Sequence, residues 1–142
     1  MTPPEAAPLI RVIAMPADTN PTGDIFGGWL MAHMDQAGAT VALRRARGRV
    51  ATIAVEGMKF HRPVKVGDEV SLYGTLLGVG RTSIRVQVEA WRRDRSAEDA
   101  SQVTEAVFIF VALDAAGQPR PVDEIGRPAA GDEGVAAPQK AQ

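Results

Sequence analysis

Hydrophobic residues recur with two different periods along the chain, and the change of period predicts the order of its secondary structure. Over residues 83–93 they alternate with polar residues, which is the period of a β-strand with one dry and one solvated face. Over residues 29–46 they cover most of the circumference of a helix. Shorter apolar runs predict four further strands, at 9–15, 51–60, 69–77 and 104–113. The predicted order is β-α-β-β-β-β, an α+β domain with one helix and five strands.

The last predicted strand is apolar on both faces. One face carries Ala106, Phe108, Phe110 and Ala112, and the other carries Val107, Ile109, Val111 and Leu113. A strand that is covered on both faces lies inside a sheet, and the helix is expected to cover one side of it. The chain's own loops or a second subunit could cover the other side. We favour a second subunit because few loops remain.

The two ends of the chain differ in composition from the middle. Residues 1–8 are rich in proline and alanine, and we expect a flexible lead-in to a domain at 9–122. Residues 123–142 lack aromatic side chains and are rich in glycine, proline and alanine, which predicts a disordered tail. The helix is expected to end in a basic turn, with Gly48 as the first residue beyond it.

Composition restricts the kinds of function that the chain can have. Its 142 residues are 45% hydrophobic, enough for one domain with a proper core, and the net charge is −1. That balance gives no general attraction to nucleic acid or to an anionic membrane. The chain has no cysteine and two histidines, so we expect neither a metal site nor a cofactor. No signal peptide or long apolar span is visible, and a soluble cytoplasmic protein is expected.

Asp35 is out of place in the middle of the apolar helix. Its neighbours on helical spacing are Met31, Gly38, Ala39 and Ala42, none of which can pair with a carboxylate. Burying an unpaired charge costs several kcal/mol. Two interpretations remain open at this point. The side chain points into solvent and pairs with a distant arginine, or the small residues leave room for a ligand beside it.

Gly27 and Gly28 stand where the helix begins. Residues without a Cβ atom let a ligand approach the backbone closely, and the first N–H groups of a helix have no partner within it. The helix dipole adds positive potential there, which stabilises an anion or a developing oxyanion. Taken alone, the pair is an ordinary glycine-rich helix entry. Together with Asp35 it points to carbonyl chemistry, with donors for the oxygen and a base or nucleophile for the carbon.

Four segments of the chain closely resemble the YciA-like acyl-CoA thioesterases of the hotdog fold. In order they read NPTGDIFGGWLMAHMDQAGA, VEGMKFHRPVKVGDEV, VGRTSIRVQVEAW and TEAVFIFVALDAAGQPRPV, and they extend over most of residues 10–122. The resemblance implies a long central helix wrapped by a five-stranded antiparallel sheet. It also implies hydrolysis of acyl-CoA to a free acid and CoA, at a site between the two subunits of a homodimer. Such proteins are often hexamers, built as trimers of dimers.

The resemblance also assigns roles to individual residues. Asp35 falls on the catalytic aspartate, as a general base for water or as a direct nucleophile, and the sequence does not separate these. Gly28 offers the backbone N–H that polarises the thioester carbonyl. Asn20 and Asp24 match positions near the reacting centre, although a simple Gly-Asp turn would also account for Asp24.

A second set of residues matches the part of the family that meets the nucleotide end of CoA. The set comprises Gly80, Arg81, Thr82 and Ser83, with Lys59 and Arg62 as further basic candidates. A guanidinium offers charged donors to a phosphate, and hydroxyls add neutral ones. A β-turn with a solvated arginine is the alternative.

Other functions fit the sequence less well. Hotdog dehydratases use a histidine with a carboxylate, but His33 lies two residues before Asp35, so the two side chains point to different faces of the helix. A non-catalytic acyl-CoA binder or sensor would use the same tunnel, yet it would not need the acidic residue. A purely structural oligomerisation domain leaves Asp35 unexplained.

Overall fold

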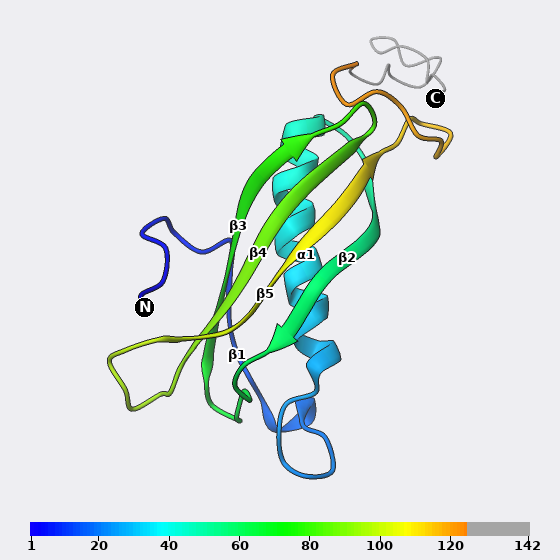
Figure 1. Ribbon diagram of the computed structural model, residues 1–142. Coiled ribbons are helices and arrows are strands. Elements are labelled where there is room, and N and C mark those ends of the chain that lie inside the picture. The colour runs from blue at the N-terminus through cyan, green and yellow to red at the C-terminus, as the bar shows by residue number, and fades with distance from the viewer. Residues whose placement is uncertain (125–142) are drawn as a thin grey trace.

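The predicted β-α-β-β-β-β order is confirmed in the computed structural model, which describes residues 1–124 (Figure 1). The helix α1 extends over Gly27–Ala46, and a short 3-10 turn, Pro16–Asp18, precedes it. The strands are β1 (Ile10–Ile13), β2 (Val50–Phe60), β3 (Glu69–Val79), β4 (Ser83–Arg93) and β5 (Ser101–Ala112). None of the helices over the described residues is long and apolar enough to span a membrane.

The five strands form one antiparallel sheet in the order β1-β3-β4-β5-β2. β5 lies between β4 and β2, so the prediction that this strand is internal is confirmed. β2 is an edge strand, and its outer edge pairs with no other strand of the described chain. Two irregularities in its register with β5 add local bends to this edge.

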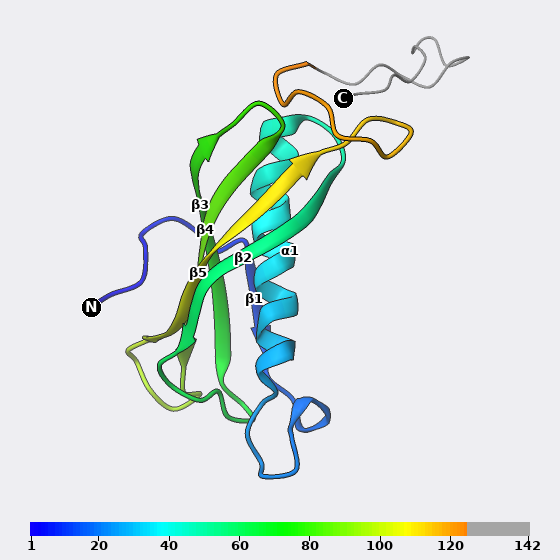
Figure 2. The same cartoon turned by 45° about the vertical axis from the view of Figure 1, so that its right-hand side comes forward.

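The hydrophobic core lies between α1 and one face of the sheet. Figure 2 shows the strands on one side of α1, curving partly around it. Leu30 and Met34 from the helix meet inward residues of the central strands, among them Phe108 and Phe110. On the opposite face of β5 the side chains of residues 107, 109 and 111 stay partly exposed, so the chain's own loops do not complete their cover.

Gly38 provides close packing between the helix and the sheet. A Cβ atom at this position would lie 3.1 Å from both the Phe110 ring and a Val88 methyl group. The glycine therefore makes room for the sheet, and the expectation that it leaves room for a ligand is wrong. The sequence could not show this, because both contacts come from strands more than forty residues away.

α1 ends at Ala46 in a basic turn, as predicted, but the residue that takes the left-handed conformation differs. Arg47, with φ 58°, takes the left-handed conformation that was expected of Gly48. The Gly48 position is instead close to the guanidinium of Arg120, whose Nη2 atom lies 2.9 Å from where a Cβ would stand. The start is also two residues earlier than predicted, at Gly27.

Arg120 ties the C-terminal segment to the end of the helix. Its side chain is fully buried and donates to the carbonyl oxygens of Ala46 at 2.8 Å and Leu113 at 3.1 Å. Of the tail predicted from residue 123, only Asp123 and Glu124 fall within the described residues. The Asp123 carboxylate forms an ion pair with the Arg45 guanidinium at 2.8 Å. The rest of the predicted tail lies outside the described residues.

Candidate active site

The loop before α1 is organised by the side chain of Asn20. Its Oδ1 atom accepts hydrogen bonds from the Thr22 N–H at 2.9 Å, the Thr22 hydroxyl at 2.8 Å and the Asp24 N–H at 3.1 Å. Three donors on one amide oxygen fix the turn. The Ile25 N–H, at the end of the loop, donates to the Val64 carbonyl at 3.0 Å. The loop therefore reaches the helix in one defined conformation.

Asp24 forms an ion pair across this loop. Its Oδ1 atom accepts a hydrogen bond from the Lys65 ammonium at 2.5 Å, and its side chain is 37% exposed. The structure thus gives this carboxylate a partner on the connection that follows β2.

The first turn of α1 presents free backbone donors. Phe26 precedes the helix without a capping side chain, so no hydroxyl or carboxylate takes up the first N–H groups. Within the described chain the Gly28 N–H has no hydrogen-bond partner. A Cβ atom on Gly28 would meet nothing within 4 Å, which shows that the space beside it is open. This end of the helix can therefore donate to an incoming oxyanion.

Asp35 is partly exposed and has one close partner. The Thr52 hydroxyl donates to its Oδ1 atom at 2.5 Å. The carboxylate is partly exposed and pairs with a hydroxyl, so the expected arginine partner is wrong, whereas the interpretation that a ligand binds beside it stays a prediction. Thr52 lies on the face of β2 that meets the helix, since it pairs in register with the core residue Phe110. A polar residue on a helix-facing strand position was the signal that the sequence analysis missed.

His33 takes no part in this arrangement. Its Nδ1–H donates to the Trp29 carbonyl at 2.9 Å, and its ring lies 4.4 Å from the Trp29 ring centre to centre. The imidazole is therefore used within its own helix. This agrees with the expectation that His33 and Asp35 do not act together.

Gly28 and Asp35 lie on the same face of α1 but far apart along it. They are seven positions apart, which is about two turns and about 10 Å of helix. A thioester carbonyl whose oxygen contacts the Gly28 N–H does not reach the Asp35 carboxylate directly. One chain therefore holds both kinds of group, but not within reach of a single carbonyl.

The predicted CoA-binding turn lies beside the C-terminal end of α1. The Gly80 N–H closes it by donating to the Ser83 carbonyl at 2.8 Å. The Thr82 carbonyl accepts from Ala112 and the Arg81 carbonyl from Val122, so β5 and the C-terminal segment hold the turn. The Arg81 side chain is exposed, and its guanidinium has no partner in the part of the chain that the structure describes.

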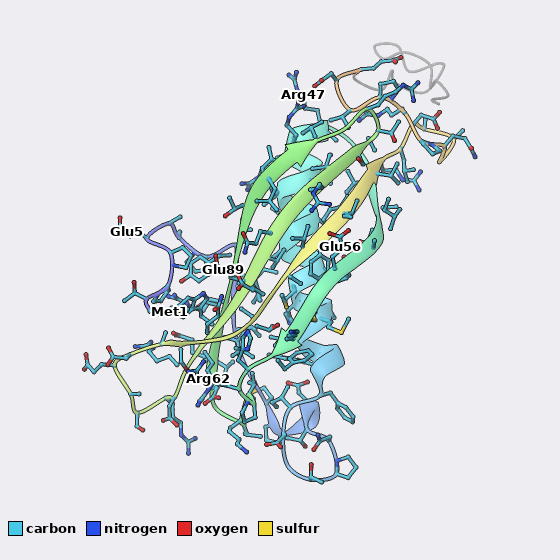
Figure 3. The ribbon with its side chains drawn as sticks, in the orientation of Figure 1. Met1, Glu5, Arg47, Glu56, Arg62 and Glu89 are labelled. Atoms are coloured by element: carbon cyan, nitrogen blue, oxygen red, sulfur yellow. The ribbon has the colours of Figure 1, made fainter. Side chains whose placement is uncertain are left out.

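Lys59 and Arg62 lie at the opposite end of the molecule from Arg81. Figure 3 shows Arg62 near the end of β2, far from the helix terminus marked by Arg47. The Arg62 guanidinium donates to the Gln102 carbonyl at 2.8 Å. Lys59 points away from α1, because the next residue, Phe60, packs on the helix start. One chain does not gather the predicted basic residues into one site.

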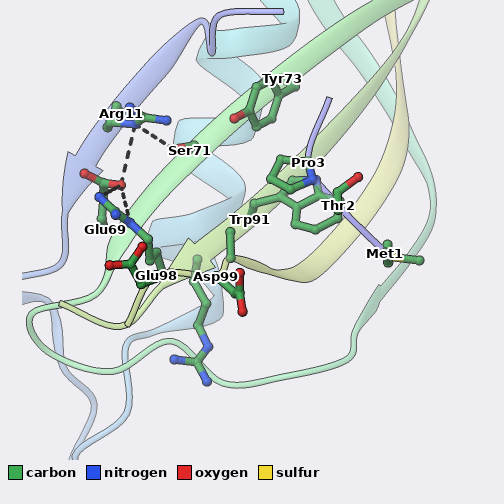
Figure 4. Close-up of a pocket in the computed structure, with 13 residues that line it drawn as sticks. Met1, Thr2, Pro3, Arg11, Glu69, Ser71, Tyr73, Trp91, Glu98 and Asp99 are labelled. Carbon is green, nitrogen blue, oxygen red and sulfur yellow. Dashed lines mark hydrogen bonds and ion pairs between the residues drawn. The ribbon is translucent and has the colours of Figure 1, made fainter. Parts of the chain in front are cut away.

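A cavity adjoins the candidate site. It measures about 380 Å³ and lies beside the first turn of α1. Another cavity, of about 580 Å³, lies on the sheet face away from α1 and contains none of the predicted site residues (Figure 4). Its Arg11 and Arg93 already face Glu69, at 3.8 and 2.9 Å. Among residues 1–124 no group of three His, Asp or Glu side chains is arranged to hold a metal ion.

Comparison with known proteins identifies the family. Residues 22–98 match the thioesterase superfamily. The acyl-CoA thioester hydrolase YciA of Salmonella typhimurium is 50% identical over 122 residues, covering 84% of this chain and 92% of that protein. The hexameric thioesterase y2039 from Yersinia pestis is 48% identical, with a TM-score of 0.79 over 83% of this chain and 96% of that one.

A more distant structure carries a bound substrate. The acyl-CoA hydrolase from Staphylococcus aureus, in complex with butyryl coenzyme A, coenzyme A and coenzyme A disulfide, is 29% identical to this chain. It has a TM-score of 0.74, over 79% of this chain and 68% of that one. The helix, the sheet order and the four matching segments agree with these comparisons, so the expected fold and family are confirmed. The chain belongs to the thioesterase superfamily and, within it, to the YciA-like acyl-CoA thioesterases of the hotdog fold.

Proposed function

We propose that this chain hydrolyses acyl-CoA to a free carboxylic acid and CoA, with Asp35 as the catalytic carboxylate. The observation that carries the proposal is the position of Asp35 on α1, partly exposed and fixed by the Thr52 hydroxyl. A carboxylate held by one oxygen keeps the other free to act on a substrate. The names of the relatives, which are acyl-CoA thioester hydrolases, support the same reaction.

The chemistry needs only groups that the chain provides. In the general-base route, Asp35 removes a proton from water while the water oxygen attacks the thioester carbonyl carbon. The carbonyl oxygen becomes an oxyanion, which the Gly28 N–H stabilises. The C–S bond then breaks, and the CoA thiolate leaves and takes up a proton. In the nucleophilic route, the Asp35 carboxylate attacks the carbonyl carbon, the C–S bond breaks and the CoA thiolate leaves. Water then cleaves the resulting mixed anhydride, which releases the free acid and restores the carboxylate. Neither route uses a metal or a cofactor.

We further propose that a second copy of the chain completes each site. Gly28 and Asp35 lie about 10 Å apart along one helix, too far to act on one carbonyl. If the α1 helices of two copies lie side by side in opposite directions, Gly28 of one copy comes close to Asp35 of the other. The unpaired edge of β2 is eleven residues long and exposes apolar side chains, with Ile53 58% exposed. Such an edge favours pairing with another strand. A homodimer through β2, and three such dimers as a hexamer, is the proposed assembly.

The nucleotide end of CoA is proposed to bind at the Gly80–Ser83 turn. From Asp35 to the end of α1 at Ala46 the helix extends about 16 Å, so CoA can lie along it with its thioester at Asp35. The free guanidinium of Arg81 suits a phosphate at the far end. Asn20 shapes the loop at the helix start, and Asp24 pairs with Lys65 there, so both are proposed to support the reacting centre. Lys59 and Arg62 remain candidates through the partner subunit.

The test is release of CoA from acyl-CoA by wild type and by Asp35→Asn. A thiol-reactive dye reports CoA without background, because the chain has no cysteine. The variant is expected to be slower by a factor of about 100 or more, since it keeps the shape and removes the base. Asp99→Asn, in the exposed loop before β5, is the matched control and should retain the wild-type rate.

Other outcomes would assign a different role to the site. Equal rates for wild type and Asp35→Asn would exclude Asp35, and Asp24→Asn would be measured next. If no acyl-CoA is hydrolysed but CoA still binds, the chain is a binder or sensor. The cytoplasmic location and the domain limits at residues 9 and 122 stay predictions.

A further inference from the structure

The turn between β2 and β3 is anchored by the buried carboxylate of Asp68. Its side chain is 2% exposed, and its Oδ2 atom accepts hydrogen bonds from the Lys65 N–H at 2.9 Å and the Arg92 guanidinium at 3.1 Å. The Asp68 carbonyl accepts from the Ala14 N–H at 3.0 Å, just after β1. A buried carboxylate with a charged partner and a backbone donor is held firmly in place. The turn at residues 65–68 therefore has one defined conformation, which β1 and β4 set.

This turn holds the loop before α1 at two adjacent points. The Val64 carbonyl accepts the Ile25 N–H at 3.0 Å, and both of these side chains are buried in the core. Beside this contact the Lys65 ammonium donates to the Asp24 carboxylate at 2.5 Å. Both segments lie at the same end of the molecule as the start of α1 (Figures 1 and 2). The Asp24 carboxylate is thus tied to a rigid turn, just ahead of the helix.

Lys65 adds little to the stability of the fold. The Lys65 and Asp24 side chains are 57% and 37% exposed, and ion pairs in such positions contribute little to folding. The backbone hydrogen bond and the buried Val64 and Ile25 side chains hold the loop without the ammonium. A role for Lys65 must therefore come from its effect on the Asp24 carboxylate.

A free carboxylate in this place would compete with the substrate. Asp24 is four positions before Gly28 and two before Phe26, which precedes the helix without a capping side chain. Aspartate near a helix start readily accepts hydrogen bonds from the first N–H groups, and the positive end of the dipole attracts it. With the Asp24 carboxylate held by Lys65, the Gly28 N–H has no partner in the described chain. The ion pair keeps the carboxylate off the donor that an oxyanion needs.

We propose that Lys65 is a positioning residue for the oxyanion donor. It holds the Asp24 carboxylate away from the first turn of α1 and offsets its negative charge. The inference rests on the proposed function, in which the Gly28 N–H stabilises the oxyanion, and it adds the group that keeps this donor available. The chain from Asp24 to Gly28 spans at most about 14 Å. Within that distance an uncompensated unit charge slows formation of an oxyanion by about three- to tenfold, at the screening typical of a protein surface.

The experiment measures kcat and KM for butyryl-CoA with wild type, Lys65→Met and Lys65→Arg. Methionine has no charge, so kcat should fall about three- to tenfold while KM changes less than about twofold. Arginine keeps the charge and should retain at least about half of the wild-type kcat. Arg93→Met is the matched control, because it removes an exposed ion pair with Glu69 on the sheet face away from α1. It should keep the wild-type kcat, and both methionine variants should melt close to the wild-type temperature.

A second background tests whether Lys65 acts through Asp24. In Asp24→Asn the charge is gone, so adding Lys65→Met should change kcat less than about twofold. An equal loss in both backgrounds overturns the inference, and so does a Lys65→Met kcat within about twofold of wild type. If Asp24→Asn has no measurable rate, the carboxylate itself is required, and the inference that its charge must be offset is also overturned.

Failure of the proposed function gives a different result. If wild type hydrolyses no acyl-CoA, the proposed function fails and this inference fails with it. If wild type is active and Lys65→Met matches it, only the role of Lys65 is wrong. Circular dichroism checks that each variant is folded. Should Lys65→Met not fold, Lys65→Gln, which also lacks the charge, must show the same loss of kcat, and an unchanged kcat overturns the inference.

Discussion

Replacing Arg120 by methionine is expected to destabilise the domain strongly. The guanidinium is 1% exposed, and no carboxylate of the described chain accepts a hydrogen bond from it. It donates instead to five backbone carbonyls, those of Ala46, Leu113, Pro121, Val122 and Glu124. Methionine has a similar length but no donors, so several buried carbonyls would lose their partners.

The magnitude follows from two opposing effects. A hydrogen bond to a charged group contributes about 1.5–3 kcal/mol, and five such bonds would overstate the effect if simply added. Removing the guanidinium also removes the cost of keeping a charge out of water. We expect a net loss of about 3–5 kcal/mol in the free energy of unfolding. For a domain of this size, that lowers the melting temperature by about 10–15 °C.

Thermal unfolding followed by circular dichroism tests this, at one protein concentration because subunit association also affects the melting temperature. The control is Arg45→Met, which removes the ion pair with Asp123 on the same segment. That pair is exposed, so its loss should cost less than about 1 kcal/mol. If Arg120→Met lowers the melting temperature no more than Arg45→Met does, the carbonyl cluster does not stabilise the fold.

Three smaller perturbations test other contacts. Thr52→Val should lower kcat about tenfold, because Asp35 loses a hydrogen bond, while Thr52→Ser keeps most of the rate; equal rates would contradict this. Gly48→Ala should cost about 1–3 kcal/mol, because a methyl would stand 2.9 Å from the buried guanidinium; an unchanged melting temperature would refute it. The pKa of Asp94 lies below its usual value because the Ser96 N–H, and then its hydroxyl, donate to the carboxylate. Ser96→Ala should raise that pKa, measured by NMR titration. A depressed folded pKa stabilises the fold at pH values above it, and this stabilisation is lost as the pH falls through the folded pKa. In Ser96→Ala the stabilisation should be smaller and should be lost at a higher pH. An unchanged pKa would exclude the Ser96 hydroxyl as a cause of the shift.

The sequence predicted the elements of this fold well because their signals are local. Alternation over β4 and the doubly apolar β5 indicated strands, and the second also indicated a place inside the sheet. The end of α1 at Ala46 was predicted, but the surroundings of Gly48 were not, because Arg120, which occupies the space beside it, is 74 positions from Ala46 along the chain. A side chain that arrives from such a distance leaves no trace in a local pattern.

The candidate site was predictable as a set of residues but not as an arrangement. Asp35 was singled out by its charge in an apolar helix, yet its partner Thr52 depends on which strand lies beside the helix. The basic residues were grouped by type, whereas Lys59 and Arg81 are at opposite ends of one chain. Both the Asp35–Thr52 contact and the separation of Lys59 from Arg81 depend on the order of the strands in the sheet, which hydrophobic periodicity does not show.

The separation of Gly28 and Asp35 along one helix has a genetic consequence for the proposed two-chain site. A chain with Asp35→Asn lacks the base, and a chain with Gly28→Pro lacks the oxyanion donor but keeps a residue tolerated in a first helical turn. When the two are mixed, one site of each hybrid dimer carries both defects and the other carries neither. Two inactive alleles would then complement each other inside one protein, which a site contained in a single chain could never do.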